Sequence, residues 1–126
     1  MGRRLAKRGV HPDLMLSSPA VRALKTARLL ARRLHYRRRD IVVRAGLYAC
    51  QTSDLMRAVR ALDSRYQRVM LVGHNPEITA LARRLGGQML NMPTCAVACF
   101  DFDVESWADI ARESLVHMRF DTPERT

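Results

Sequence analysis

Long apolar runs are missing from this sequence, and cysteine is scarce. No stretch of eighteen apolar residues occurs, so the sequence predicts no transmembrane helix. The basic N-terminal stretch, residues 1–9, is not followed by the apolar core of a signal peptide. Three cysteines, an odd number, give no disulfide framework and are typical of a reducing compartment. These absences predict a cytoplasmic protein that has no membrane partner.

Acidic residues are also few: twelve, against twenty-two lysines and arginines, which gives a formal net charge of +10. Such a surface attracts anions, namely nucleic acid, acidic proteins or phosphorylated small molecules. The basic residues gather at 22–44, with an arginine run at 37–39. We favour a solvated arginine-rich helix there, because aromatic residues make up only 6% of the chain and no known nucleic-acid-binding motif is present. A basic nucleic-acid-binding module is the less favoured alternative.

The hydrophobic pattern alternates between helices and strands along one expected domain, residues 1–126. A helix with one apolar face is predicted over 19–34, and a continuous apolar run predicts a strand buried on both faces over 69–73. Further helices are expected at 54–62 and 76–85, a helix end closed by Gly9 at 5–8, and further strands at 13–17, 41–43, 96–103 and 115–120. This alternation predicts an α/β fold of three layers, α/β/α, with a mostly parallel sheet.

Two segments share one design, a buried strand followed by a polar residue and a proline that open a helix. In the first, Ser18 is expected to cap the helix and Pro19 to be its first residue. In the second, Asn75 and Pro76 take the same places. Each segment puts a helix N-terminus at the carboxyl end of a strand, where α/β sheets bind ligands. Two such N-termini on one edge predict an anion pocket suited to phosphate.

Four side chains are the candidates for this pocket. Arg22, as the expected fourth helical residue, can reach back to the helix N-terminus and hold phosphate oxygens bidentately. His74 follows Gly73 at a strand end and can serve as phosphate ligand, acid, base or nucleophile. Ser18 and Asn75 are the expected polar phosphate-binding residues beside them. The plainer alternatives are a surface arginine at position 22 and, at position 74, a turn histidine bonded to its own backbone.

The same residues resemble two motifs of a known family. Residues 17–27, Ser-Ser-Pro-Ala-Val-Arg-Ala-Leu-Lys-Thr-Ala, resemble the second-arginine motif of the histidine phosphatase superfamily, which includes the phosphoglycerate mutases. Residues 72–76, Val-Gly-His-Asn-Pro, resemble its second-histidine motif. Residues 47–48, 92–94 and 102–107 fit loops of its small SixA-like branch. The resemblance runs through almost the whole chain in the family's order.

The resemblance implies a phosphoglycerate mutase-like fold and hydrolysis of a phosphoramidate or phosphomonoester without a metal or other cofactor. In the family, a histidine of an Arg-His-Gly or Arg-His-Ala motif on the first strand takes the phosphoryl group, and water then releases it. Arg22 would be the second arginine and His74 the second histidine, and both would stabilise the charge of the transferring group. The substrate would be a phosphohistidine protein or a small phosphorylated metabolite.

No Arg-His-Gly or Arg-His-Ala sequence occurs in the 126 residues. The fold is therefore expected to lack its first strand, together with the nucleophile. His11, in a loop, and His35, after the long helix, are not expected to replace that nucleophile. Three explanations remain open: an N-terminally truncated chain whose start is misassigned, a truncated gene, or an inactive phosphate-binding protein. We favour the first, because Met1 lies inside an expected helix that has no capping residue.

Overall fold

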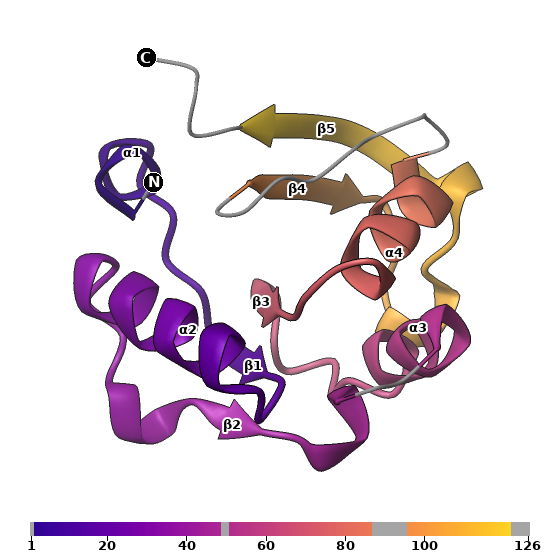
Figure 1. The fold of residues 1–126 in the computed structure, drawn as a ribbon. Helices are drawn as coiled ribbons and strands as arrows, with labels where there is room; N and C mark the ends of the chain where they lie inside the picture. The colour runs from indigo at the N-terminus through magenta and orange to yellow at the C-terminus, as the bar shows by residue number, and fades with distance from the viewer. Residues whose placement is uncertain (1, 49–50, 87–95, 122–126) are drawn as a thin grey trace. The chain divides into compact units, whose positions relative to one another are not determined.

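The computed structural model describes residues 2–48, 51–86 and 96–121. It divides the chain into two compact units, the first of residues 1–50 and 65–74, the second of residues 51–64 and 75–126. Figure 1 shows the elements of both units. The described helices and strands are α1 Gly2–Lys7, β1 Leu14–Ser17, α2 Val21–Arg33, β2 Val42–Val43, α3 Thr52–Arg60, β3 Val69–Val72, α4 Glu77–Gly86, β4 Val97–Phe102 and β5 Leu115–Asp121.

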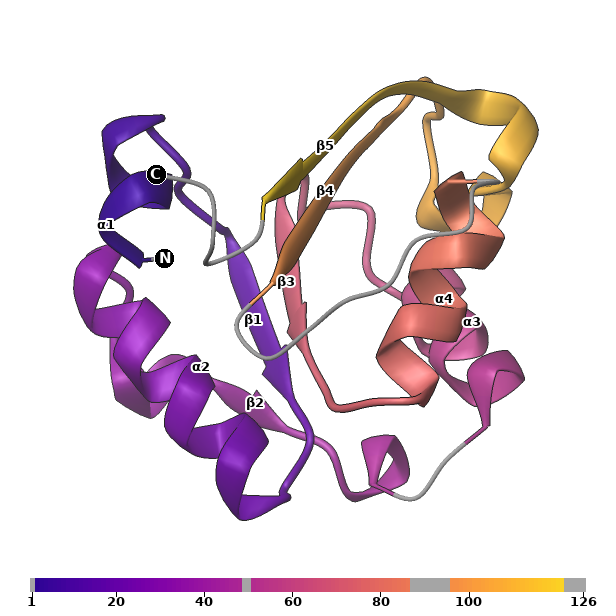
Figure 2. The ribbon, with the colours of Figure 1, turned by 45° about the horizontal axis from the view of Figure 1, so that its top comes forward.

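The first unit contains a parallel three-stranded sheet in the order β2-β1-β3. β1 is the central strand, as Figure 2 shows for its pairing with β3, and all four of its residues are buried. Leu16 of β1 pairs with Leu71 of β3 on one side and with Val42 of β2 on the other. The α/β fold with a parallel sheet, predicted from the sequence, is confirmed.

Helix α2 packs on this sheet through small side chains. Alanines recur at spacings of four along it, at positions 23, 27 and 31, and all three are buried. They form one cluster with Met15 of β1 and Val72 of β3. A methyl group in place of a larger side chain lets the helix backbone lie close to the strands. The apolar face predicted for this helix is confirmed.

The two helices that were predicted to open with a proline, α2 and α4, begin later than their prolines. The prediction that Ser18 caps α2 and that Pro19 opens it is wrong, because the capping position is Ala20 and the helix begins at Val21. The prediction that Pro76 opens α4 is also wrong, since that helix begins at Glu77. In the first case the reason is local. The Ser18 hydroxyl accepts a hydrogen bond from the Ala20 N–H at 3.2 Å, which forms a serine turn before the helix.

β3 is less buried than its continuous apolar run predicts. Val69, Met70 and Leu71 are only half-buried, and Val72 alone is buried. Among the described residues β3 pairs with β1 alone, whereas β1 pairs on both sides. The prediction of a strand buried on both faces therefore fits β1 and is wrong for β3.

Two helix ends of the first unit use the left-handed backbone region. α1 ends before Gly9, whose φ is 73°, as predicted for a glycine C-cap. α2 ends in the same way at a non-glycine residue, His35, whose φ is 58°. There the N–H of Tyr36 donates to the carbonyl of Ala31 at 2.8 Å, which is the hydrogen bond of a Schellman motif.

The second unit combines α3, α4 and an antiparallel pair of strands. β4 and β5 pair along their length, and α4 contacts both α3 and the two strands. The Gln51 N–H donates to the Asp54 carboxylate at 2.9 Å and so caps α3. The sequence predicts the last two strands but not which strand each one pairs with. In the structure they form a sheet of their own, distinct from the parallel one.

No helix in the described ranges has the length and apolar content needed to cross a bilayer.

Candidate functional site

The three parallel strands of the first unit end at the same level. Ser17, the last residue of β1, pairs with Val43 of β2 and with Val72 of β3. The backbone pairing continues one residue further on both sides. The N–H of Arg44 donates to the Ser17 carbonyl, and the N–H of Ser18 donates to the Val72 carbonyl, both at 3.0 Å. The residues that follow each strand therefore meet at one edge of the sheet, the edge at which α/β folds bind ligands.

Ser18 is a buried residue at this edge that holds the turn between β1 and α2. Its side chain is fully buried, and its hydroxyl oxygen accepts the hydrogen bond from the Ala20 N–H. The hydroxyl of Ser17, also fully buried, donates to the Ser18 carbonyl at 2.8 Å. These bonds fix the turn between β1 and α2. The geometry gives Ser18 a positioning role, and its use as a phosphate ligand stays a prediction.

Arg22 lies at the N-terminus of α2. Because the helix begins at Val21, Arg22 is its second residue and not its fourth. Its side chain is exposed, and helical side chains lean toward the N-terminus, so the guanidinium can reach the N-terminal end of the helix. The first turn of α2 has no acidic residue, and the Ala20 capping position makes no side-chain hydrogen bond. Backbone N–H groups and a cation thus offer positive charge to the same place.

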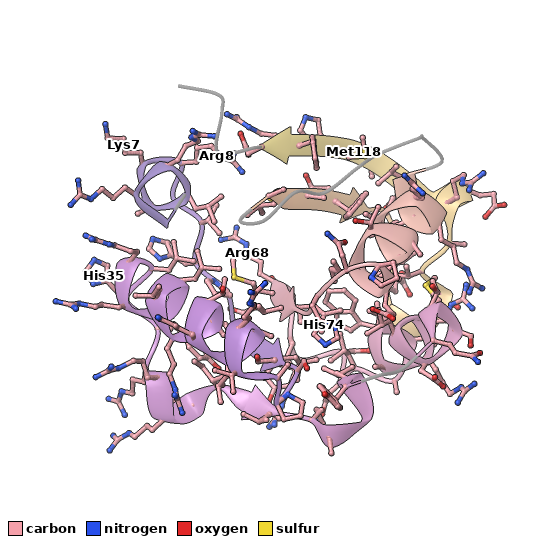
Figure 3. The ribbon with its side chains drawn as sticks, in the orientation of Figure 1. Lys7, Arg8, His35, Arg68, His74 and Met118 are labelled. Carbon is pink, nitrogen blue, oxygen red and sulfur yellow. The ribbon has the colours of Figure 1, made fainter. Side chains whose placement is uncertain are left out.

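His74 follows β3 after a single glycine. The imidazole is half-buried, and the ring of Tyr48 meets it edge-on, with the ring centroids 5.9 Å apart and the planes at 74°. Figure 3 shows His74 just beyond the end of β3. Since Ser18 is hydrogen-bonded to Val72, the chain segments that carry Ser18 and His74 are neighbours at this edge. An aromatic neighbour restricts the orientations that the imidazole can take.

Asn75 belongs to the second unit, in which it serves its own helix. The Thr79 hydroxyl donates a hydrogen bond to the side-chain oxygen of Asn75. Thr79 is buried in α4, and Asn75 is exposed. A helix cap would accept a backbone N–H, and α4 begins at Glu77 with Pro76 directly before it, so the prediction that Asn75 caps this helix is wrong. A phosphate-binding role for Asn75 stays a prediction.

Two further residues at the strand edge were missed in the sequence. Arg44 follows β2 directly, so the level strand ends bring an exposed guanidinium to the edge that Ser18 borders. The sequence places Tyr48 in a loop, and the structure brings its ring into contact with His74. The signal for Arg44 was present, because it follows a predicted strand as His74 does. For Tyr48 no sequence signal predicts the contact.

The chemistry available at this edge is that of anion binding. Arg22 and Arg44 carry permanent charge, and the ring nitrogens of His74 can form hydrogen bonds to an anion. In the part of the chain that the structure describes, no three side chains among histidine, cysteine, aspartate and glutamate are grouped so that they could hold a metal ion. The side chains suit a tetrahedral oxyanion such as phosphate.

Two solved structures resemble the chain over nearly its whole length. The first is a protein assigned as the phosphohistidine phosphatase SixA from Agrobacterium tumefaciens, with 26% identity and a TM-score of 0.74 over 97% of this chain and 75% of that one. The second carries the same assignment, from Nakamurella multipartitia, with 19% identity and a TM-score of 0.76 over 98% of this chain and 77% of that one. No protein-family model and no curated protein sequence matches the chain.

Proposed function

Starting from its fold, which is that of the SixA-like branch of the histidine phosphatase superfamily, we propose that this chain binds the phosphoryl group of a phosphorylated substrate at the carboxyl edge of its parallel sheet. The reaction that this site serves is the hydrolysis of phosphohistidine, or of a small phosphorylated metabolite, to phosphate. A protein phosphorylated on histidine is the substrate that the two similar structures suggest, because both are assigned as phosphohistidine phosphatases.

The observation that carries this proposal is the coincidence of the fold with the sequence motifs. The structural likeness extends over 97% of the chain, and the two family motifs fall where two of its parallel strands end. A surface arginine at position 22 or a turn histidine at position 74 would each be ordinary alone. Their placement on adjoining segments of one sheet edge supports a shared ligand.

Each site residue has a distinct part in the proposal. Arg22 holds two phosphate oxygens through its planar guanidinium, next to the uncapped N–H groups of α2. His74 donates a hydrogen bond to a third oxygen and stabilises the charge that develops during transfer. Ser18 keeps the turn before α2 in place, and Asn75 accepts a hydrogen bond from Thr79 at the start of α4.

The nucleophile of the family has no counterpart in the sequence. The 126 residues contain no Arg-His-Gly or Arg-His-Ala. We therefore expect this chain by itself to bind phosphate without turning over a phosphorylated substrate. A protein that carries such a segment ahead of these residues would transfer the phosphoryl group to that histidine, and water would then release phosphate. The alternative to such a longer enzyme is that the function of this chain is phosphate binding without catalysis.

Binding of inorganic phosphate and of vanadate, measured by isothermal titration calorimetry, tests the site. Arg22→Ala should weaken binding about 10- to 100-fold, the loss expected for a hydrogen bond to a charged group. Arg22→Lys should recover only part of the affinity, because an ammonium cannot bind two oxygens in a fork. Arg32→Ala is the matched control, since Arg32 is exposed on the same helix but far from its N-terminus, and it should leave binding unchanged.

Turnover separates the two forms of the proposal. Phosphate release from a phosphohistidine peptide should be absent for the 126-residue chain and present for a protein that begins with the family's first strand. Release by neither protein, together with phosphate binding that depends on Arg22, would leave the inactive binder as the function. Phosphate affinity that is equal in wild type and Arg22→Ala would overturn the proposed site.

A further inference from the structure

The charge of this protein is divided unevenly between its two compact units. Residues 1–50 and 65–74 contain fifteen lysines and arginines and only two acidic residues, Asp13 and Asp40, which gives +13. Residues 51–64 and 75–126 contain seven basic and ten acidic residues, which gives −3. The net charge of +10 is therefore a property of the first unit and not of the surface in general.

Much of this positive charge gathers around α2. Two open hollows lie in this region of the first unit. One is lined by Arg28, Arg37, Arg38 and Arg39. The other is lined by Arg3, Ala6, Lys7, Arg32, Arg33 and His35. We call the eight lysines and arginines of the two hollows the basic face. Figure 3 shows basic side chains that extend outward from α1, α2 and the segment after α2, with Lys7 and His35 among them.

Acidic side chains in the described part of the chain do not neutralise the basic face. All eight of its lysines and arginines are exposed, and none forms an ion pair with a described carboxylate. The sequence of α2 contains five basic residues and no acidic one. Like charges such as Arg28 and Arg32, four residues apart, repel each other along a helix. A polyanion lying on this face would remove that repulsion.

The composition of the face decides which polyanion fits. A stable protein interface has aromatic or aliphatic side chains at its centre. A helix that binds an anionic membrane inserts apolar side chains into it. Leu29 is the one large hydrophobic residue of α2 beyond Val21 that is exposed. Nucleic-acid interfaces are, by contrast, strongly basic and polar. The face is also arginine-rich, and the guanidinium group binds phosphate oxygens in pairs.

The lack of phenylalanine, tyrosine and tryptophan in the two hollows narrows the choice of polyanion further. Single-stranded nucleic acid is held largely by stacking of bases on aromatic rings. Among the residues that line the two hollows, only His35 has an aromatic ring, and none is a phenylalanine, tyrosine or tryptophan. The tyrosine nearest in sequence, Tyr36, is half-buried, and its hydroxyl donates to the Asp40 carbonyl at 3.0 Å. We infer that the basic face binds the phosphate backbone of double-stranded nucleic acid, without reading its sequence.

Binding of a fluorescein-labelled DNA duplex of about 20 base pairs, followed by fluorescence anisotropy at salt concentrations from about 50 to 200 mM, tests this inference. The affinity should fall steeply with salt, with a slope of log K against log salt of about −0.9 for each phosphate contacted. Duplexes of different sequence should bind equally. A triple variant, Arg37→Gln, Arg38→Gln and Arg39→Gln, should bind at least about tenfold more weakly and reduce the slope by about two to three.

The matched control removes the same charge from the other unit. The variant Arg57→Gln, Arg83→Gln and Arg84→Gln has the same net charge as the first triple variant, and all three of its arginines are exposed. It should bind the duplex as wild type does. Circular dichroism melting of both variants checks that they fold. Arg22→Ala should keep duplex binding, so that failure of the proposed phosphate site and failure of the basic face are seen in different variants.

Several results would overturn the inference. Equal weakening by both triple variants would mean that only net charge matters. No binding of the duplex at the lowest salt would remove the face as a nucleic-acid site. Tight binding of vesicles that contain phosphatidylserine, or of polyglutamate, in the absence of duplex binding, would assign the face to a membrane or to an acidic protein instead.

Discussion

At the scale of single residues, His35 has an unusual backbone conformation and the Tyr36 phenol has an unusual environment. His35 has a positive φ at the end of α2, the position that glycine takes at the end of α1. Tyr36 follows it and connects two elements of the first unit. Its hydroxyl accepts from the Met15 N–H at 3.4 Å and donates to the Asp40 carbonyl. Both residues lead to measurable expectations.

His35→Gly should raise the free energy of unfolding by about 0.5 to 1 kcal/mol. Glycine adopts the left-handed region without the clash that a Cβ atom causes, although its greater freedom in the unfolded chain offsets part of the gain. Urea unfolding measures the difference. His35→Ala is the control, because it keeps the Cβ atom and should give no gain. A glycine variant that is no more stable than wild type would contradict this account of the helix end.

Tyr36 makes stability depend on pH in the alkaline range. Burial raises the pKa of the Tyr36 phenol above its usual value of 10.0. The folded protein therefore holds the phenolic proton more tightly than the unfolded chain. The stabilisation is fully present below the unfolded pKa and is lost as the pH rises through the folded one. Tyr36→Phe should lower stability at neutral pH by about 1 kcal/mol and lose this alkaline decline.

Unfolding of wild type and of Tyr36→Phe, measured between neutral pH and pH of about 11, checks both parts of this expectation. The two stability curves should converge as the phenol ionises. Curves that stay parallel across the whole range would show that the ionisation of Tyr36 is not linked to folding.

At the scale of elements, the start of the parallel sheet is held by one carboxylate. Asp13 precedes β1, and its Oδ2 atom accepts hydrogen bonds from the N–H groups of Gln67 at 2.9 Å and Arg68 at 3.0 Å, just before β3. The backbone joins the same places, since the Asp13 N–H donates to the Arg68 carbonyl at 2.7 Å. Asp13 thereby ties the entry of β1 to the entry of β3.

Asp13→Ala should lower the free energy of unfolding by about 1 to 3 kcal/mol, because two N–H groups lose a charged acceptor. Asp13→Asn keeps an acceptor oxygen and should cost less. Chemical denaturation of the three proteins gives the order directly. If alanine and asparagine proved equally mild, with a loss under about 0.5 kcal/mol, solvent would be satisfying both N–H groups.

The sequence predicts the helices and strands of this protein better than it predicts where they begin or which strands pair. The helix over α2 follows from its alanine and leucine spacing, and the Gly9 helix end follows from the residue type. The start of α2 could not be predicted, because Ser18 bonds to Ala20 in a turn that competes with helix capping. The partial exposure of β3 could not be predicted either, since an apolar run does not reveal how many strands pair with it.

For the candidate site, the sequence predicts which residues lie at the sheet edge, because they directly follow strands. Ser18 and His74 follow strands that proved to be adjacent and level, so a rule about strand ends was enough to place them at one edge. The same rule applies to Arg44, although the strand before it is only two residues long. The contact between Tyr48 and His74 depends on the path of a loop, which no periodic pattern encodes.

At the scale of the whole molecule, the excess of positive charge works against folding. A unit with +13 repels itself, and compact states bring like charges closer together than the unfolded chain does. Salt screens this repulsion, with a Debye length of about 10 Å at 0.1 M. The charge distribution therefore makes ionic strength a condition that any study of this protein has to control.

The midpoint of thermal unfolding should rise by a few degrees between about 20 and 200 mM sodium chloride, because screening relieves the repulsion in the folded state. Scanning calorimetry measures the midpoint. The variant with glutamine at positions 37, 38 and 39 should show a smaller rise, since it removes three of the repelling charges. A midpoint that falls with salt would mean that attractive ion pairs outweigh the repulsion.

The level ends of the three parallel strands also restrict where the chain can gain or lose a residue. Successive residues of a strand point to opposite faces, so a deletion of one residue within Val69–Val72 would turn the residues that follow, His74 included, to the other side of the sheet. A deletion in the stretch 61–64 between α3 and β3 changes no strand pairing. Length variation among relatives of this chain should accordingly be frequent between α3 and β3, and rare from the first residue of β3 to its histidine.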